Sequence, residues 1–228
     1  MLKATDLYDL TQTDHAAIFD GCNYAWEALA KIEPYLARVP RQATPRTFPG
    51  ASIGNRVIIG EGTMVEPGAM IKGPAIIGKN CQIRHNAYIR ENVIIGDDCV
   101  VGNASELKNA WLFNGVQVPH YNYIGDSILG YKAHLGAGAK ISNVKLLPGN
   151  VAVELDGVLT DTGLRKFGAL LGDHAEAGCN AVLNPGTILG RHAVVYPNVF
   201  WRGILQANHI AKNKAAVEVV TRRPSETR

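Results

Sequence analysis

The first candidate for chemistry is His120, in the segment PHYNYIGD that runs from Pro119 to Asp126. A neutral imidazole with a pKa of about 6.5 can accept a proton at cellular pH, so this histidine could act as a general base. Its neighbours Tyr121 and Tyr123 are half-polar at a point where the preceding chain would supply aliphatic residues. A solvent-facing loop histidine is the alternative, and residue types alone leave both interpretations open.

Three cations form a second candidate, because Lys72, Arg90 and Lys108 are spaced eighteen residues apart. If eighteen residues make one coil, these side chains stack about 4.8 Å apart, which is the spacing of neighbouring strands. Two like charges at this distance repel by under about 1 kcal/mol in water, and by more when partly desolvated. A phosphate would offset the repulsion, whereas solvated cations at turns would need no ligand.

A six-residue repeat supplies the elements that would position these side chains. An aliphatic or aromatic residue recurs every six positions at Ile53, Ile59, Val65, Ile71, Ile77, Ile83, Ile89, Ile95, Val101, Leu107 and Phe113. The position four residues after each of these is mostly small. A period of six fits neither an α-helix nor a hairpin-joined sheet, but it fits a parallel β-solenoid with three short strands per coil.

The repeat also divides the chain, because it is interrupted near His120 and again at residues 146–168. Pro-Gly, Asp-Gly and Thr-Gly pairs in the second interruption predict a loop or hairpin extruded from the solenoid. We expect a helical N-terminal extension at residues 1–45 that covers the first coil, since an open solenoid end needs a cap. The β-helix is expected at 46–205 and a C-terminal tail at 206–228.

The composition argues against several classes of function. The net charge of +3 is spread along 228 residues without a basic stripe, so nucleic acid is not an expected partner. The sequence has no run of eighteen apolar residues and no signal-peptide pattern, so we expect a cytoplasmic protein without a membrane partner. The four cysteines form no CxxC pair, which argues against a zinc site or a thioredoxin-type redox centre.

Residues 80–143 resemble the acetyltransferase domain of the bifunctional N-acetylglucosamine-1-phosphate uridyltransferase/glucosamine-1-phosphate acetyltransferase family. The motifs that carry the resemblance are IR, VGNxxExK, HxxYxGD and GAG. The resemblance implies a left-handed parallel β-helix that assembles as a homotrimer with active sites between subunits. It also implies acetyl-coenzyme A as co-substrate, glucosamine 1-phosphate as acceptor, and no metal.

The same resemblance assigns roles to individual residues. His120 matches the catalytic base, and Glu106 matches the acid that orients it. Ala137, in GAG, matches a backbone contact to the acetyl donor. The positions that match contacts to the sugar and its phosphate are Arg90, Lys108, Tyr123, Asn143 and Lys166.

Three departures from the family keep other functions open. His134 stands where the family usually has an asparagine facing the substrate, and Cys179 and Pro197 replace small residues that contact the donor. The uridyltransferase half is absent from this sequence. One alternative is therefore an acyltransferase that acts on a nucleotide-linked amino sugar. Another is a non-catalytic solenoid that binds a sugar phosphate and partners a separate sugar nucleotidyltransferase.

Overall fold

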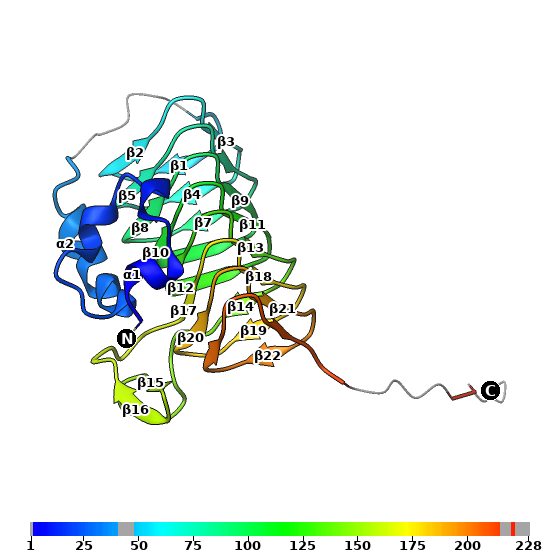
Figure 1. The fold of residues 1–228 in the computed structure, drawn as a ribbon. Helices are drawn as coiled ribbons and strands as arrows, with labels where there is room; N and C mark the ends of the chain where they lie inside the picture. The colour runs from blue at the N-terminus through cyan, green and yellow to red at the C-terminus, as the bar shows by residue number, and fades with distance from the viewer. Residues whose placement is uncertain (1, 41–47, 215–219, 222–228) are drawn as a thin grey trace.

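The computed structural model describes residues 2–40, 48–214 and 220–221, and most of them form a left-handed parallel β-helix (Figure 1). This architecture confirms the predicted fold class. Except for one hairpin, the paired strands run parallel and lie one coil apart. The inward-facing residues are aliphatic or small and form one continuous core along the axis of the helix.

Two sheets make up the walls of the β-helix. The larger sheet has two arms, which the long strands β10 (Glu106–Leu112) and β12 (Tyr123–Leu129) join. Its first arm also contains β1 (Ser52–Ile53), β4 (Met70–Ile71), β7 (Tyr88–Ile89), β14 (Lys140–Ile141), β19 (Val182–Leu183) and β22 (Phe200–Trp201).

The second arm follows the first along each coil, and the smaller sheet closes the coil. The second arm contains β2 (Val57–Ile59), β5 (Ala75–Ile77), β8 (Val93–Ile95), β17 (Ala169–Leu171), β20 (Thr187–Leu189) and β23 (Ile204–Leu205). The smaller sheet contains β3 (Met64–Val65), β6 (Gln82–Ile83), β9 (Val100–Asn103), β11 (Gln117–His120), β13 (His134–Leu135), β18 (Glu176–Ala177), β21 (Val194–Val195) and β24 (Ile210–Ala211).

The coil shortens by one residue at the first interruption of the repeat. Ile89 lies opposite Leu107, eighteen residues later, whereas Leu107 lies opposite Ile124, only seventeen residues later. The prediction that Phe113 continues the inward series is therefore wrong. Leu112 takes the inward position, and Phe113 is buried on the outside of the wall.

The shortening occurs at the corner between the two arms of the larger sheet. Asn109 in β10 and Asp126 in β12 each turn this corner with a left-handed backbone, at φ +47° and +48°. Asparagine and aspartate adopt this conformation more readily than most residues. Arg56 and Asn92 have the same left-handed backbone at this corner in coils of full length, so the shortening is the loss of one residue before the corner residue and not a change in its conformation.

The N-terminal helices lie along one wall of the β-helix, so the predicted cover over the first coil is wrong (Figure 1). The helices are α1 (Ala4–Leu7), η1 (Leu10–Gln12), η2 (Ala16–Phe19), η3 (Ala25–Lys31) and α2 (Ile32–Leu36). The second arm is apolar on its outer face as well, where Ile94, Trp111 and Ile128 are fully buried beneath the helices. Burial of this apolar surface explains the position of the helices.

Within residues 146–168 the chain forms an antiparallel hairpin of β15 (Ala152–Leu155) and β16 (Val158–Asp161). Asp156 and Gly157 both have positive φ at its turn, as a two-residue type I′ hairpin turn requires. At the other end of the chain, β24 pairs with β21, so the last coil extends beyond residue 205. Residues 41–45 of the expected extension and most of the tail beyond residue 214 lie outside the described residues.

Candidate active site

His120 lies at the exposed end of β11, where the chain turns from the smaller sheet into β12. The turn is held by the buried Asn122, whose side-chain oxygen accepts a hydrogen bond from the His120 backbone N–H at 3.1 Å. The Asn122 amide donates to the carbonyls of Gly136 and Ala139 in the next coil, at 2.8 and 3.1 Å. The backbone that presents His120 is therefore fixed from inside the β-helix.

His120 is part of a column of residues that runs along this corner. The backbone oxygens of His120, Ala137 and Cys179 each accept a hydrogen bond from the next coil, from Gly138 at 2.9 Å, Asn180 at 2.9 Å and Asn198 at 3.0 Å. Pro197, which precedes Asn198, continues the column. The predicted base and the positions expected to contact the donor thus follow one another along a single edge.

Ala137 has the geometry that a backbone contact needs. Its carbonyl is used by Asn180, but its N–H has no hydrogen-bond partner within the described parts of the chain. The residue is half-buried. The corner can therefore offer a free backbone N–H to a carbonyl or amide of a bound acyl donor.

Gly102 makes the close stacking at this corner possible. A Cβ at this position would overlap the backbone of Pro119, directly before His120. We expect Gly102→Ala to lower the free energy of unfolding by about 3 kcal/mol, the upper end of typical overpacking costs. Urea denaturation measures this loss, and Gly163→Ala is the comparison without a clash: its Cβ would meet nothing within 4 Å, so only the left-handed backbone at φ +72° opposes it, at a cost of about 1 kcal/mol. Equal stability of the two variants would contradict the predicted clash.

Glu106 begins β10, opposite Tyr123 of the next coil. Its carboxylate forms an ion pair with Arg90, with Oε1 3.0 Å from Nη1. The His120 ring has no hydrogen-bond partner among the described residues, so the single chain does not join Glu106 to His120. The structure thus brings Glu106 to a cation and leaves the imidazole free.

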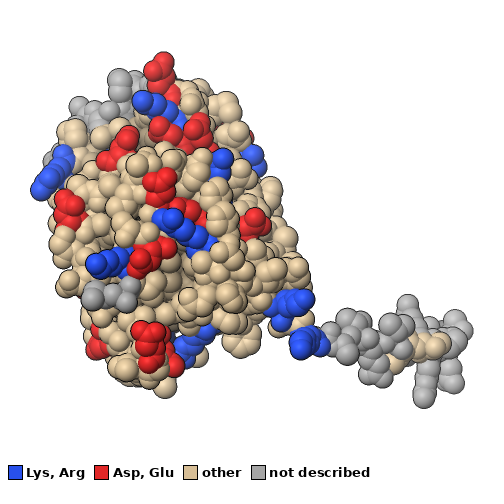
Figure 2. All heavy atoms as spheres, in the orientation of Figure 1, with Lys and Arg blue, Asp and Glu red and all other residues tan. Residues whose placement is uncertain are grey.

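The cation column is present, and carboxylates of the same chain lie beside it. Lys72 and Arg90 donate their backbone N–H groups to Ile89 and Leu107, which places the column in register. Glu91 lies 3.5 Å from the Lys72 ammonium and 3.7 Å from the Arg90 guanidinium. The repulsion expected within the column is therefore offset internally. On the face shown in Figure 2, cationic and acidic side chains are interspersed in the same way.

Lys108 continues this column, and its ammonium lies 3.5 Å from the buried carboxylate of Asp126. Asn143 donates its side-chain amide to the same carboxylate. Tyr123 lies nearby and is partly buried, and this burial raises the pKa of its phenol, with the nearby Glu106 and Asp126 as smaller causes. The phenol is therefore expected to be a neutral hydrogen-bonding group in the physiological range.

Lys166 reaches the same region from the end of the hairpin segment. It forms an isolated antiparallel bridge with Val144, and the following residue, Phe167, donates its N–H to the Asn143 carbonyl at 3.0 Å. The Lys166 side chain is exposed. The hairpin thus returns the chain so that Lys166 lies next to the segment after β14 that carries Asn143.

Two features of the site were missed in the sequence. Asn122 and Asp126 organise the corners, and both belong to the segment that interrupts the repeat. The signal for the shorter coil was present, because Ala110, Leu112 and Val116 resume the inward pattern one position early. Counting the repeat with one deletion would have found it.

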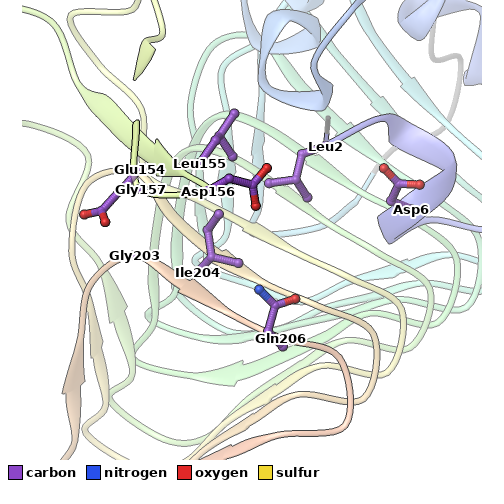
Figure 3. A pocket seen from close by; sticks show the side chains of 9 residues that line it. All are labelled: Leu2, Asp6, Glu154, Leu155, Asp156, Gly157, Gly203, Ile204 and Gln206. Carbon is purple, nitrogen blue, oxygen red and sulfur yellow. The ribbon is translucent and has the colours of Figure 1, made fainter. Parts of the chain in front are cut away.

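Other features of the described chain lie apart from this site. A pocket between α1, the hairpin and β23 is lined by Asp6, Glu154, Asp156 and Ile204 among others, and by none of the predicted site residues (Figure 3). No group of three or more histidine, cysteine or acidic residues in the described part could hold a metal ion. No described helix is long and apolar enough to cross a membrane.

Comparison with known proteins gives consistent matches. The family model described as the GMPPB C-terminal domain matches residues 71–164. The bifunctional protein GlmU of Methanococcus maripaludis strain C7 is 38% identical over 200 residues, which are 88% of this chain and 48% of the relative. The bifunctional sugar-1-phosphate nucleotidylyltransferase/acetyltransferase of Sulfurisphaera tokodaii is 34% identical over 96 residues, which are 42% of this chain and 24% of the relative.

Among solved structures, the Francisella novicida UDP-N-acetylglucosamine acyltransferase is 18% identical, with a TM-score of 0.42, and the match covers 70% of this chain and 59% of that one. This chain spans about half the length, or less, of the curated relatives named above.

Proposed function

The chain is a hexapeptide-repeat relative of the bifunctional GlmU proteins, and we propose that it is an acetyl-coenzyme A-dependent N-acetyltransferase. Its acceptor is an amino-sugar phosphate, most simply glucosamine 1-phosphate, which becomes N-acetylglucosamine 1-phosphate. The observation that carries this proposal is the arrangement of the first arm. The column of His120 and Ala137 lies at one corner of this arm, and the cations Arg90 and Lys108 lie towards the other.

The proposed reaction needs a base and an oriented acceptor. The amine of the sugar attacks the thioester carbonyl, a C–N bond forms, the C–S bond breaks, and coenzyme A leaves as the thiol. The proton lost by the amine passes to the neutral imidazole of His120, which is exposed and has no internal partner in the described chain. Arg90, Lys108 and Lys166 would hold the phosphate, which lowers the entropic cost of bringing the amine to the thioester.

Tyr123 and Asn143 would face the sugar between these two regions, because both lie on the first arm beside the cations. For the donor, the free N–H of Ala137 would contact acetyl-coenzyme A along the column that continues through Cys179 and Pro197. Cys179 and Pro197 are both exposed on that edge, so neither is packed into the core of the β-helix.

Assembly completes this proposal. The His120 ring and the Ala137 N–H both lie at an outer corner of the chain, where one subunit supplies only one wall of a cleft. We therefore assign the second wall to another copy of the chain in a homotrimer. A sugar nucleotidyltransferase is a further proposed partner, because the Sulfurisphaera tokodaii relative is named as both a sugar-1-phosphate nucleotidylyltransferase and an acetyltransferase.

A thiol-release assay tests this function directly. The chain is mixed with acetyl-coenzyme A and, in parallel, with glucosamine 1-phosphate, glucosamine 6-phosphate, free glucosamine and a nucleotide-linked amino sugar. Release of coenzyme A that depends on glucosamine 1-phosphate supports the proposal. Release only with the nucleotide-linked sugar would replace the acceptor, and His134 would then be the first residue to examine.

One observation favours a second function, a non-catalytic solenoid that binds a sugar phosphate. The proposed orienting acid, Glu106, is paired with Arg90 and not with His120. Binding of glucosamine 1-phosphate without binding of acetyl-coenzyme A, both measured by calorimetry, would support this function over catalysis.

Arg90→Gln is expected to raise the KM for glucosamine 1-phosphate by about ten- to a hundredfold, because a charge-assisted contact to phosphate contributes about 1.5–3 kcal/mol. The KM for acetyl-coenzyme A should change little. Initial-rate kinetics with each substrate varied in turn measures both constants. Lys79→Gln, which removes one exposed positive charge from another corner, is the control and should leave both constants unchanged. An equal rise in the KM of both substrates would contradict the placement of the phosphate.

A further inference from the structure

Asp126 is a buried carboxylate in the site, and neither the repeat nor the family resemblance assigns it a role. Its side chain is only 6% exposed, and three side chains from neighbouring coils meet it. Asn109 donates from Nδ2 to Oδ1 at 2.9 Å, Asn143 donates to Oδ2, and the Lys108 ammonium lies 3.5 Å from Oδ1. Asp126 is therefore the point at which two residues of the proposed substrate site, Lys108 and Asn143, are tied together.

The backbone of Asp126 adds a third connection. Its carbonyl accepts a hydrogen bond from Gly168 at 2.8 Å, two residues after Lys166. A Cβ on the preceding Gly125 would lie 2.6 Å from the Asn143 amide nitrogen and 2.8 Å from the Tyr123 hydroxyl. The absence of a side chain at Gly125 thus leaves the space in which Asn143 and Tyr123 approach one another.

The chemistry of a carboxylate fixes the orientation of its partners. An isolated buried carboxylate is costly, whereas one that receives two amide donors beside a cation is compensated. The oxygens of Asp126 accept hydrogen bonds from Asn109 and Asn143, so Asn143 turns its NH₂ group towards Asp126. The amide oxygen of Asn143 then points away from Asp126. The ion pair with Asp126 holds the ammonium of Lys108 in place, although the lysine side chain is long and flexible.

We propose that Asp126 is a positioning residue that presents the Lys108 ammonium and the Asn143 amide to the acceptor. This inference rests on the proposed function, since it concerns the same site. Asp126 acts through its two partners and need not touch the sugar phosphate. Its role predicts that substitution at 126 weakens acceptor binding and leaves the donor affected much less.

The test compares wild type with Asp126→Asn, which keeps the size of the side chain and removes its charge. Calorimetry with glucosamine 1-phosphate should show the Kd raised about tenfold, and thiol-release kinetics should show a similar rise in the acceptor KM. The KM for acetyl-coenzyme A is expected to change less than twofold. A purely structural role would lower the thermal midpoint and leave the acceptor Kd of the folded protein unchanged, which would overturn the proposal.

A double-mutant cycle with Lys108→Met tests whether Asp126 acts through Lys108. If it does, the loss of acceptor affinity in the double variant should be smaller than the product of the two single losses, and the loss beyond that of Lys108→Met is the part that acts through Asn143. Losses that multiply fully would contradict the route through Lys108. Asn109→Ala, which removes one donor to Asp126, should raise the Kd about threefold. If Asp126→Asn does not fold, an unchanged Kd in Asn109→Ala overturns the proposal.

The binding measurement separates this inference from the proposed function. A wild type that binds glucosamine 1-phosphate but releases no thiol would contradict the catalytic function and leave the role of Asp126 to be decided by the Kd values. A wild type that acetylates, together with an unaltered Asp126→Asn variant, would overturn only the role of Asp126. A wild type that neither binds nor acetylates would overturn both.

Discussion

Replacing His120 with alanine is expected to lower kcat for thiol release by about 10²–10⁴-fold, the usual contribution of a general base. The imidazole takes the proton that the attacking amine must lose, and the other histidine of this column, His85, lies two coils away from it. The KM values of both substrates should change little, because the phosphate is assigned to Arg90 and Lys108 and the donor to Ala137. Steady-state kinetics at saturating concentrations of both substrates measures the effect.

Folding should not confound this result. The His120 ring is exposed and makes no described hydrogen bond, and the turn is held by its backbone and by Asn122. The thermal midpoint of His120→Ala should therefore match that of wild type. His209→Ala, which removes an exposed histidine from the last coil, is the matched control and should retain full activity. Activity of His120→Ala within threefold of wild type would exclude this histidine as the base.

The hexad repeat predicted the fold because each inward position must be apolar for a coil to stack on its neighbours. The same rule caused the wrong assignment of Phe113 to an inward position. Counting in sixes from Leu107 reaches Phe113, and an aromatic residue there satisfied the pattern although it faces outward. The corner residues do not mark the shorter coil in the sequence, because Arg56 and Asn92 have the same left-handed backbone as Asn109 and Asp126 in coils of full length.

The position of the N-terminal helices could have been inferred from strand composition. Strands exposed on one face usually alternate apolar and polar residues, whereas Ile94, Trp111 and Ile128 lie among apolar neighbours on both sides. Such strands are covered on both faces. The assumption that a solenoid end needs a cap directed attention to the first coil, away from this wall.

The candidate site was only partly predictable for an electrostatic reason. Spacing and resemblance selected Arg90, Glu106 and Lys108, and parallel stacking necessarily placed them on one arm. The partner that each charge selects depends on side-chain geometry. In the structure Arg90 binds Glu106, and Lys108 lies beside Asp126, so the proposed phosphate would compete with carboxylates of the same chain.

Trp111→Ala is expected to lower the free energy of unfolding by about 3–5 kcal/mol, the usual cost of truncating a buried aromatic residue. Trp111 is fully buried and packs between the β-helix and the N-terminal helices, with its ring centroid 4.9 Å from that of Phe19 and 4.8 Å from that of Phe113. At about 2–4 °C per kcal/mol for a chain of this size, the thermal midpoint should fall by roughly 6–20 °C. Differential scanning calorimetry and urea denaturation measure the two quantities.

Trp111→Phe is the control that isolates packing from hydrogen bonding. The indole Nε1 is buried without a hydrogen-bond partner in the described structure, so phenylalanine removes a polar atom that contributes no bond and keeps most of the aromatic contact. We expect Trp111→Phe to lose less than half as much stability as Trp111→Ala. Because β10 carries Trp111 on the wall covered by the helices and Lys108 on the first arm, the alanine variant tests whether the helices support the site. If they do, the acceptor KM of Trp111→Ala should be raised even at assay temperatures well below its unfolding midpoint. An unchanged KM together with a lowered midpoint would show that the helices stabilise the fold without supporting the site.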